Sequence, residues 1–258
     1  MKIGISTSVI YKDWGFDIMP IFPLANKLKI DTIEIVIDEE TLKWIEKYKT
    51  DLKEQSKGLK LFFHPYDIEL NKLTLQSKKL NEIFDLCVEF EVDRLVIHPG
   101  FGKINQDLAN IKEIITIAGD AGIIILVENG YKRGELFRSI DEQLGYVKRI
   151  RERGIENIYV VFDVWRAFKV YKDTIVIAKY LKILLKSGLL KHIHFSDGKR
   201  LLDTSVALGD GEINVDLLLD TLKDFKDSVI LEVDTPEDAI KSVRYLMDRN
   251  LRQCPNRR

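Results

Sequence analysis

The chain has 258 residues, which matches the about 250 residues of an eight-unit α/β barrel and leaves too little length for two domains of ordinary size. Hydrophobic residues make up 45% of the chain and charged residues 31%, a composition typical of a soluble globular protein with a sizeable core. The net charge of -1 excludes a general electrostatic attraction to phosphate backbones, and no apolar run approaches the about 18 residues of a membrane span.

The N-terminus and the cysteines bear on cellular location. The first residues, MKIGIST, resemble a strand rather than the charged and apolar regions of a signal peptide. Cys87 and Cys254 have no metal-type spacing, which fits a reducing compartment. We therefore expect a cytoplasmic protein without membrane attachment. A charged surface rich in Lys, Glu and Ile is also compatible with a thermophilic source.

Short runs of β-branched and apolar residues recur along the chain, and each is followed by a stretch with helical periodicity. The runs predict eight strands, at residues 2–6, 32–37, 61–64, 94–98, 123–128, 158–163, 190–194 and 228–233. The amphipathic stretches between them predict helices that include residues 75–90, 107–121, 175–187 and 215–225.

Strict alternation of strand and helix predicts a parallel sheet with right-handed crossovers. A doubly wound open sheet would also alternate, but it would carry a Gly-rich phosphate turn after its first strand, where this chain has ISTSVIYKDW. The sequence therefore predicts a TIM (β/α)8 barrel. Because no linker or low-complexity tract divides the chain, we expect a single domain over residues 1–258.

Six consecutive predicted strands end on a residue type that ligates metals. These residues are His64, His98, Glu128, Asp163, His194 and Glu232. They are separated by 30 to 38 residues, close to the roughly 31 residues of one barrel unit, so all should reach the same rim. Polar residues often end a strand because the strand meets solvent there. However, three carboxylates and three imidazoles that converge on one rim favour a bound cation, which would neutralise the carboxylates and accept the lone pairs of the imidazoles.

Other polar and aromatic residues are open to two interpretations. His192 has the same inward parity as His194 but lies deeper, which favours a satisfied core histidine over a ligand. Lys199 and Arg200 could hold an anionic or hydroxylated substrate, or could be solvated surface charges. Five aromatic residues in strand-to-helix loops could stack on a sugar or cap the barrel; they are Trp14, Tyr66, Phe101, Tyr131 and Trp165.

The motifs HPYDIELN, HPG, VENG, FDVWRAF, HFSDGK, LGDGEIN and LEVDT, in this order, resemble the superfamily of xylose isomerase-like TIM barrels. This superfamily contains sugar isomerases, sugar epimerases and endonuclease IV. The resemblance to the isomerases and epimerases implies a metal held by Glu128, Asp163, His194 and Glu232. It also implies that the two glutamates act as acid and base, and that Arg200 contacts the sugar.

The endonuclease IV pattern matches this chain only in part. It implies further metal ligands at His64 and His98, which are present. Its third zinc site requires two histidines at positions where this chain has Arg166 and Ser205, so that Asp203 alone remains of that trio. Because a guanidinium does not ligate a metal at ordinary pH, we expect no third zinc.

The leading hypothesis is a metal-dependent isomerase or epimerase of a small sugar or sugar phosphate, with Glu128 and Glu232 moving the proton through an enediolate. One or two divalent ions of Mn, Zn, Co or Mg are expected. Arg166 could hold a phosphate or carboxylate, or form a salt bridge. The alternative is an abasic-site endonuclease or phosphodiesterase related to endonuclease IV, with a nucleic acid as partner. A sugar-binding protein without catalysis is a third class, and the sequence leaves homo-oligomer formation open.

Overall fold

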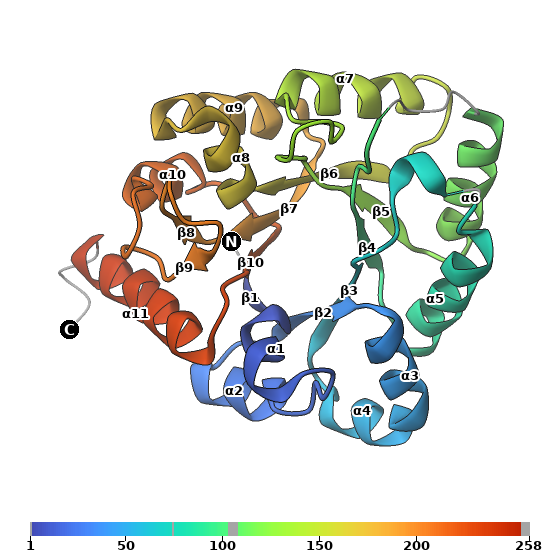
Figure 1. Ribbon diagram of the computed structural model, residues 1–258, viewed down its shortest axis with the longest axis horizontal. Coiled ribbons are helices and arrows are strands. Elements are labelled where there is room, and N and C mark those ends of the chain that lie inside the picture. The colour runs from blue at the N-terminus through green and yellow to red at the C-terminus, as the bar shows by residue number, and fades with distance from the viewer. Residues whose placement is uncertain (1, 74, 103–107, 254–258) are drawn as a thin grey trace.

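The computed structural model describes residues 2–73, 75–102 and 108–253. The TIM barrel prediction is confirmed: eight parallel strands form a closed barrel in the order β1-β10-β7-β6-β5-β4-β3-β2, and Figure 1 shows them as a ring with the helices outside it. The barrel strands are β1 (Lys2–Ser6), β2 (Thr32–Ile37), β3 (Lys60–Pro65), β4 (Arg94–Ile97), β5 (Ile124–Val127), β6 (Ile158–Asp163), β7 (Leu190–Phe195) and β10 (Ser228–Leu231).

The helices form the outer layer, and a two-stranded hairpin lies in the loop after β7. The helices are α1 (Ser8–Trp14), α2 (Ile21–Leu28), α3 (Glu39–Lys47), α4 (Lys49–Gln55), the short 3₁₀ helix η1 (Leu70–Lys72), α5 (Ser77–Glu89), α6 (Leu108–Asp120), α7 (Ile140–Arg151), α8 (Val164–Tyr171), α9 (Thr174–Ser187), α10 (Val215–Thr221) and α11 (Pro236–Gln253). The hairpin pairs β8 (Asp197–Gly198) with β9 (Ser205–Val206).

Helix α9 illustrates how the sequence defines an outer helix. The side chain of Asp173 accepts a hydrogen bond from the backbone N–H of Ile175, which satisfies one of the free donors at the helix start. Gly188 ends the helix with a φ of 70°, a left-handed conformation that glycine adopts without strain. Between these ends, Ile177 and Leu181 are buried on the inner face.

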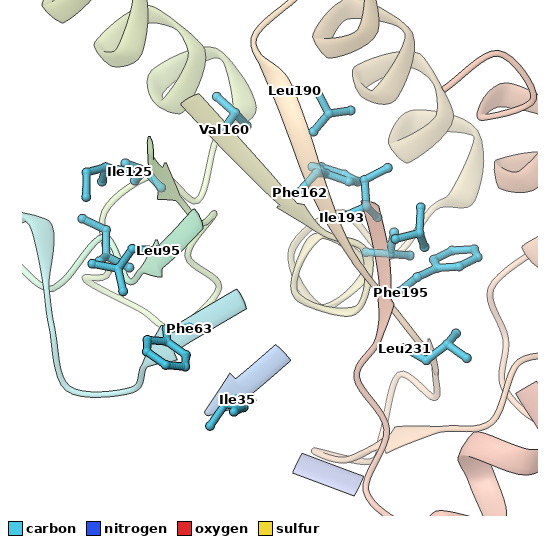
Figure 2. Packing of buried hydrophobic residues seen from close by; sticks show 14 of the residues in the cluster. Ile35, Phe63, Leu95, Ile125, Val160, Phe162, Leu190, Ile193, Phe195 and Leu231 are labelled. Atoms are coloured by element: carbon cyan, nitrogen blue, oxygen red, sulfur yellow. The ribbon is translucent and has the colours of Figure 1, made fainter. Parts of the chain in front are cut away.

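Two kinds of packing surround the strands. The larger apolar core lies between the barrel and the helices, where Ile193 and Phe195 of β7 contribute outward-facing side chains (Figure 2). Inside the barrel, a small apolar cluster is formed by Val96, Leu126 and Val161. The interior also contains buried Glu34, His64, His192 and His194, so it is polar on the side of β2, β3 and β7.

The observed strands agree with the predicted ones to within a few residues, with the largest differences at the C-terminal ends. Strands β4, β5 and β10 end before His98, Glu128 and Glu232, because the chain leaves the ladder at the barrel rim. The predicted helix start at Asp107 and the second cysteine, Cys254, lie outside the described residues. No helix in the described part of the chain is both long and apolar enough to cross a membrane.

Candidate metal centre

The C-terminal rim of the barrel brings the six strand-end residues together. The register of the sheet pairs Asp163 of β6 with His194 of β7, which places both at the same height in the barrel. On the other side, Val36 of β2 pairs with His64 of β3. Because successive side chains of a strand alternate, His192 and His194 both point inward, while Ile193 and Phe195 face the helices.

Four of these residues form a compact cluster of metal-type ligands. Glu128, Asp163, His194 and Glu232 each offer a ligand atom, and these atoms lie within 4.8 Å of one another. Nδ1 of His194 lies 2.6 Å from Oε1 of Glu128 and 3.2 Å from Oε2 of Glu232. Glu232 is the accessible member, with 23% of its side chain exposed, whereas Glu128 is fully buried.

A second cluster adjoins the first and shares Glu128 with it. His64, His98 and Glu128 also offer ligand atoms within 4.8 Å of one another. The two Nε2 atoms of His64 and His98 are 3.2 Å apart, and Nδ1 of His98 lies 2.7 Å from the backbone carbonyl of Tyr66.

Glu34 on β2 is a buried carboxylate that the sequence analysis did not identify. Its oxygens lie 3.1 Å from Nε2 of His194, 2.9 Å from Nε2 of His192 and 3.4 Å from Nδ1 of His64. His192 is fully buried, and its Nδ1 lies 2.8 Å from Oγ of Ser228. Glu34 therefore contacts three imidazole rings from the floor of the site. Together with His64, His194 and Glu232 it forms a third group of ligand atoms within 4.8 Å of one another. Its position within the run TIEIVI, with inward parity, was the available signal.

The side chain of Arg166, in the first turn of α8, reaches the same carboxylates and imidazoles. The metal-ligand cup is formed by Glu34, His64, His98, Glu128, Asp163, His194 and Glu232. Nη2 of Arg166 lies 3.0 Å from Oε2 of Glu128, and Nε of the same residue donates a hydrogen bond of 3.2 Å to Oδ2 of Asp163. A third carboxylate, Glu135, lies 3.6 Å from Nη1. The sequence allows Arg166 either to bind an anionic group or to form a salt bridge, and the structure contains the salt bridge.

Buried polar atoms that lack hydrogen-bond partners show whether the residues at this rim fit a divalent metal. Oε2 of Glu128, Oε1 of Glu34 and Nδ1 of His64 are buried and lack an aligned hydrogen-bond partner. Such atoms cost free energy unless they are paired or coordinated. Carboxylate oxygens and imidazole nitrogens at this separation suit Mn²⁺, Co²⁺ or Zn²⁺. The residues therefore fit a divalent metal. Of the three groups, we take Glu128, Asp163, His194 and Glu232 as the candidate ligands, since they contribute three carboxylates and one imidazole.

The proton affinities within the cup differ sharply from ordinary values. Burial by itself raises the pKa of Glu128, but the charge of Arg166 and the contacts with His194 and His98 hold it well below its usual range. Burial and the nearby Glu128 raise the pKa of Asp163 to about 7. Burial opposes the charged form of His194, yet the surrounding glutamates raise its pKa well above 6.5. The cup therefore retains protons that a bound cation would displace.

Two cavities open onto the site. The larger, of about 450 Å³, is lined by residues that include Lys12, Tyr66, Arg166 and Glu232. The smaller, of about 180 Å³, is also lined by Arg166 and Glu232, together with Trp165. Glu232 and Arg166 thus face both spaces, whereas Glu128 lines neither.

Comparison with known families identifies the group of proteins to which this chain belongs. The sequence model of the xylose isomerase-like TIM barrel family matches residues 11–249. The chain belongs to this family. One relative by sequence is "Uncharacterized protein MJ1311" of Methanocaldococcus jannaschii. It is 25% identical to this chain over 193 residues. That alignment covers 69% of this chain and 63% of the relative, so the match spans less than two thirds of the relative's length.

Solved structures of similar architecture include enzymes and metal-binding proteins. A D-tagatose 3-epimerase-like protein has 24% identity and a TM-score of 0.74, and the match covers 96% of each chain. The IolI protein, solved with a bound zinc atom, has 17% identity and a TM-score of 0.73, with 97% of each chain covered. At these identities the likeness shows a common fold.

The residues expected to bind substrate are distributed unevenly around this xylose isomerase-like site. Arg166 and Trp165 line the cavities, whereas Lys199, Arg200 and Trp14 are not among the described lining residues of either cavity. Arg200 instead donates a hydrogen bond of 3.1 Å to the carbonyl of Lys172, and Trp14 is 54% exposed.

The three positions that the endonuclease IV pattern assigns to a third zinc site line one cavity. The side chain of Asp203 is 75% exposed and lies 3.3 Å from Nζ of Lys169. Oγ of Ser205 donates a hydrogen bond of 3.0 Å to Asp234. These two side chains and Arg166 border the smaller cavity, but each has a different partner.

Proposed function

We propose that this protein is a divalent-metal-dependent epimerase or isomerase of a small uncharged sugar. The observation that carries the proposal is the cluster of Glu128, Asp163, His194 and Glu232 beneath a cavity large enough for a sugar. The structural similarity to a D-tagatose 3-epimerase-like protein and to a zinc-bound protein supports the same reading. A divalent ion held by this quartet would polarise adjacent carbonyl and hydroxyl oxygens and stabilise the negative charge that follows loss of a neighbouring proton.

Glu232 is the better placed of the two glutamates to take a proton from a substrate. It lines both cavities, and His194 holds the pKa of its carboxyl below the usual value against the effect of burial. The carboxylate is therefore ionised at neutral pH and can act as a base. Glu128 lies under Arg166, so we assign it first to metal binding and only second to proton transfer.

The charges around the cavities favour an uncharged sugar over its phosphate. Among the described residues that line these two cavities, Lys12 and Arg166 are the only lysine and arginine. Lys12 is paired with Asp234 at 2.8 Å, and Arg166 is paired with Glu128 and Asp163. A phosphate would have to break one of these pairs. Neutral hydroxyl groups do not incur this cost.

An exchange assay tests the proposal. Metal-loaded protein is incubated in D₂O with neutral ketoses and aldoses, and NMR follows both deuterium entry next to the carbonyl and formation of the epimer or isomer. Glu232→Gln should abolish both signals, whereas Glu237→Gln, an exposed carboxylate on α11, should leave them intact. Absence of exchange with every sugar offered would contradict the proposal.

A second candidate function is an abasic-site endonuclease or phosphodiesterase. The observation that favours it is the adjoining cluster of His64, His98 and Glu128, because a single-metal epimerase does not need those imidazoles. Cleavage of a synthetic abasic-site duplex by protein that leaves all sugars unchanged would establish this alternative in place of the first.

A further inference from the structure

The guanidinium of Arg166 is fixed at a defined position between the two ligand clusters. The side chain of Asp163 caps helix α8 and accepts the backbone N–H of Arg166 at 2.9 Å, and its other oxygen accepts Nε of the same residue at 3.2 Å. Nη2 then lies 3.0 Å from Nε2 of His98 and 3.0 Å from Oε2 of Glu128. One arm of the guanidinium therefore contacts two of the three members of the His64, His98 and Glu128 cluster.

The ring of His98 is oriented so that its metal-binding lone pair faces Arg166. Nδ1 lies 2.7 Å from the carbonyl of Tyr66, and because a carbonyl only accepts, Nδ1 must carry the hydrogen. In the neutral ring Nε2 then holds a lone pair, which accepts Nη2 of Arg166. The atom of His98 that would ligate a metal is thus already used by the protein's own cation.

A metal ion bound by His64, His98 and Glu128 would clash with the guanidinium of Arg166 in its observed position. Bonds from zinc to nitrogen and carboxylate oxygen are about 2.0–2.2 Å long, so the ion would need the same His98 and Glu128 atoms that Nη2 contacts. It would also bring a second positive charge within a few ångströms of the guanidinium in a buried setting, where the repulsion is weakly screened.

We propose that Arg166 takes the place of a second metal ion, so that the centre holds one ion and the His64, His98 and Glu128 cluster is a latent zinc site. The first ion, in the Glu128, Asp163, His194 and Glu232 quartet, rests on the proposed function. The latent site has two imidazoles and a carboxylate, which is the ligand set and count of many zinc sites.

Zinc stoichiometry measures the occupancy of both sites without reference to activity. Chelator-treated protein is dialysed to equilibrium against Zn²⁺, and bound zinc is determined by elemental analysis. The wild type should bind one ion per chain. Arg166→Leu should bind a second ion, and adding His98→Ala to that variant should remove it. Arg138→Leu, which changes an exposed arginine, should remain at one ion.

The outcomes separate this inference from the proposed function. Two ions in the wild type, or one ion in folded Arg166→Leu, would overturn the inference and leave the metal-dependent function standing. A wild type that binds no zinc would contradict the proposed function, and the inference would then depend on whether Arg166→Leu gains an ion that His98→Ala removes.

A second variant covers the case in which circular dichroism shows that Arg166→Leu does not fold. His98→Ala in the otherwise unchanged chain should still bind one ion per chain at saturating Zn²⁺, because His98 is not a ligand while Arg166 is present. Loss of that ion would make His98 a ligand of the wild-type centre and would overturn the inference.

Discussion

Glu34 lies 3.1 Å from Nε2 of His194 and approaches it from the floor of the barrel, while the other ring nitrogen faces the rim. On that side Nδ1 lies 2.6 Å from Oε1 of Glu128. The arrangement matches that of a carboxylate behind a metal-ligating histidine, which fixes the tautomer and orientation of the ring. Burial by itself raises the pKa of Glu34, but the charge of His194 and the close contacts with the three imidazoles hold it well below its usual value. Glu34 is therefore a buried anion whose partners are histidines.

Replacing Glu34 by Gln should weaken metal binding without unfolding the barrel. The amide keeps the shape of the side chain but removes the charge that orients His194 and makes it a stronger ligand. We expect the Kd for Zn²⁺ or Mn²⁺ to rise by about 10–100-fold. Competition with a chelating dye measures this change, and thermal melting checks the fold. Glu82→Gln, on the exposed face of α5, should leave the Kd unchanged. An unaltered Kd in Glu34→Gln would mean that Glu34 does not position His194.

The contrast between Glu34 and His194 shows which parts of the site can be read from the sequence. His194 ends a strand, and its spacing from Asp163 and Glu232 is that of barrel units, so its place on the rim follows from the repeat. Glu34 lies in mid-strand, within TIEIVI. Its contact with β7 crosses the closed barrel, and no local pattern reports a contact across the interior. Parity alone could have indicated that its side chain points inward.

The loop residues mark a second limit of prediction. The sequence offers both Arg166 and Arg200 as substrate-binding cations. Neither composition nor spacing shows which of the two side chains faces the site. The structure places Arg166 among buried carboxylates because it follows the strand end by three residues, within the first turn of α8. Arg200 lies on a longer loop, where Glu212 and the carbonyl of Lys172 are its partners. The path of a long loop depends on contacts that the chain makes only after folding.

Glu128→Gln should remove most of the bound metal and all activity while the protein stays folded. Glu128 belongs to two of the three groups of potential ligands, including the quartet that we propose holds the ion. We expect at least about a 100-fold loss of metal affinity, since loss of even an outer-shell partner costs about 10–100-fold. Elemental analysis and circular dichroism provide the measurements. Glu142→Gln, an exposed carboxylate on α7, is the matched control. Unchanged metal content in Glu128→Gln would contradict its assignment as a ligand.

Binding to abasic DNA should be weak and strongly dependent on salt. The net charge of -1 provides little attraction, and the two cations that line the cavities are already paired with carboxylates. We expect a Kd no tighter than about 10⁻⁶ M at physiological salt, the range of non-specific binding. Fluorescence anisotropy with a labelled abasic duplex at two salt concentrations tests this. Nanomolar affinity at physiological salt would favour the endonuclease alternative over the epimerase.

In the metal-free protein, the contribution of Asp163 to stability should fall as pH rises towards neutrality. Its folded pKa of about 7 lies above the ordinary value of 3.8, because it is buried beside Glu128. An acid with a raised folded pKa contributes stability that is fully present below pH 3.8 and is lost as pH rises through about 7. The pKa values of Glu34 and Glu232 are shifted downward, so their contributions are lost only under acid conditions. Between about pH 5 and pH 7 Asp163 is therefore the carboxyl group among these three whose contribution changes. The lowered pKa values of His98 and His192 add a slope of opposite sign, which wild type and Asp163→Asn share.

Asp163→Asn isolates this contribution, because the amide stays neutral at every pH. In chelator-treated protein, the free energy of unfolding from urea titrations between about pH 5 and about pH 7 should change less favourably in wild type than in Asp163→Asn, by on the order of a few kcal/mol. Asp224→Asn, whose side chain is exposed, should show the wild-type slope. With saturating Zn²⁺ the wild-type slope should become more positive, because the ion competes with the proton and binds more tightly as pH rises. An equal slope in wild type and Asp163→Asn would show that Asp163 is already ionised in the metal-free cup, with Arg166 holding its charge.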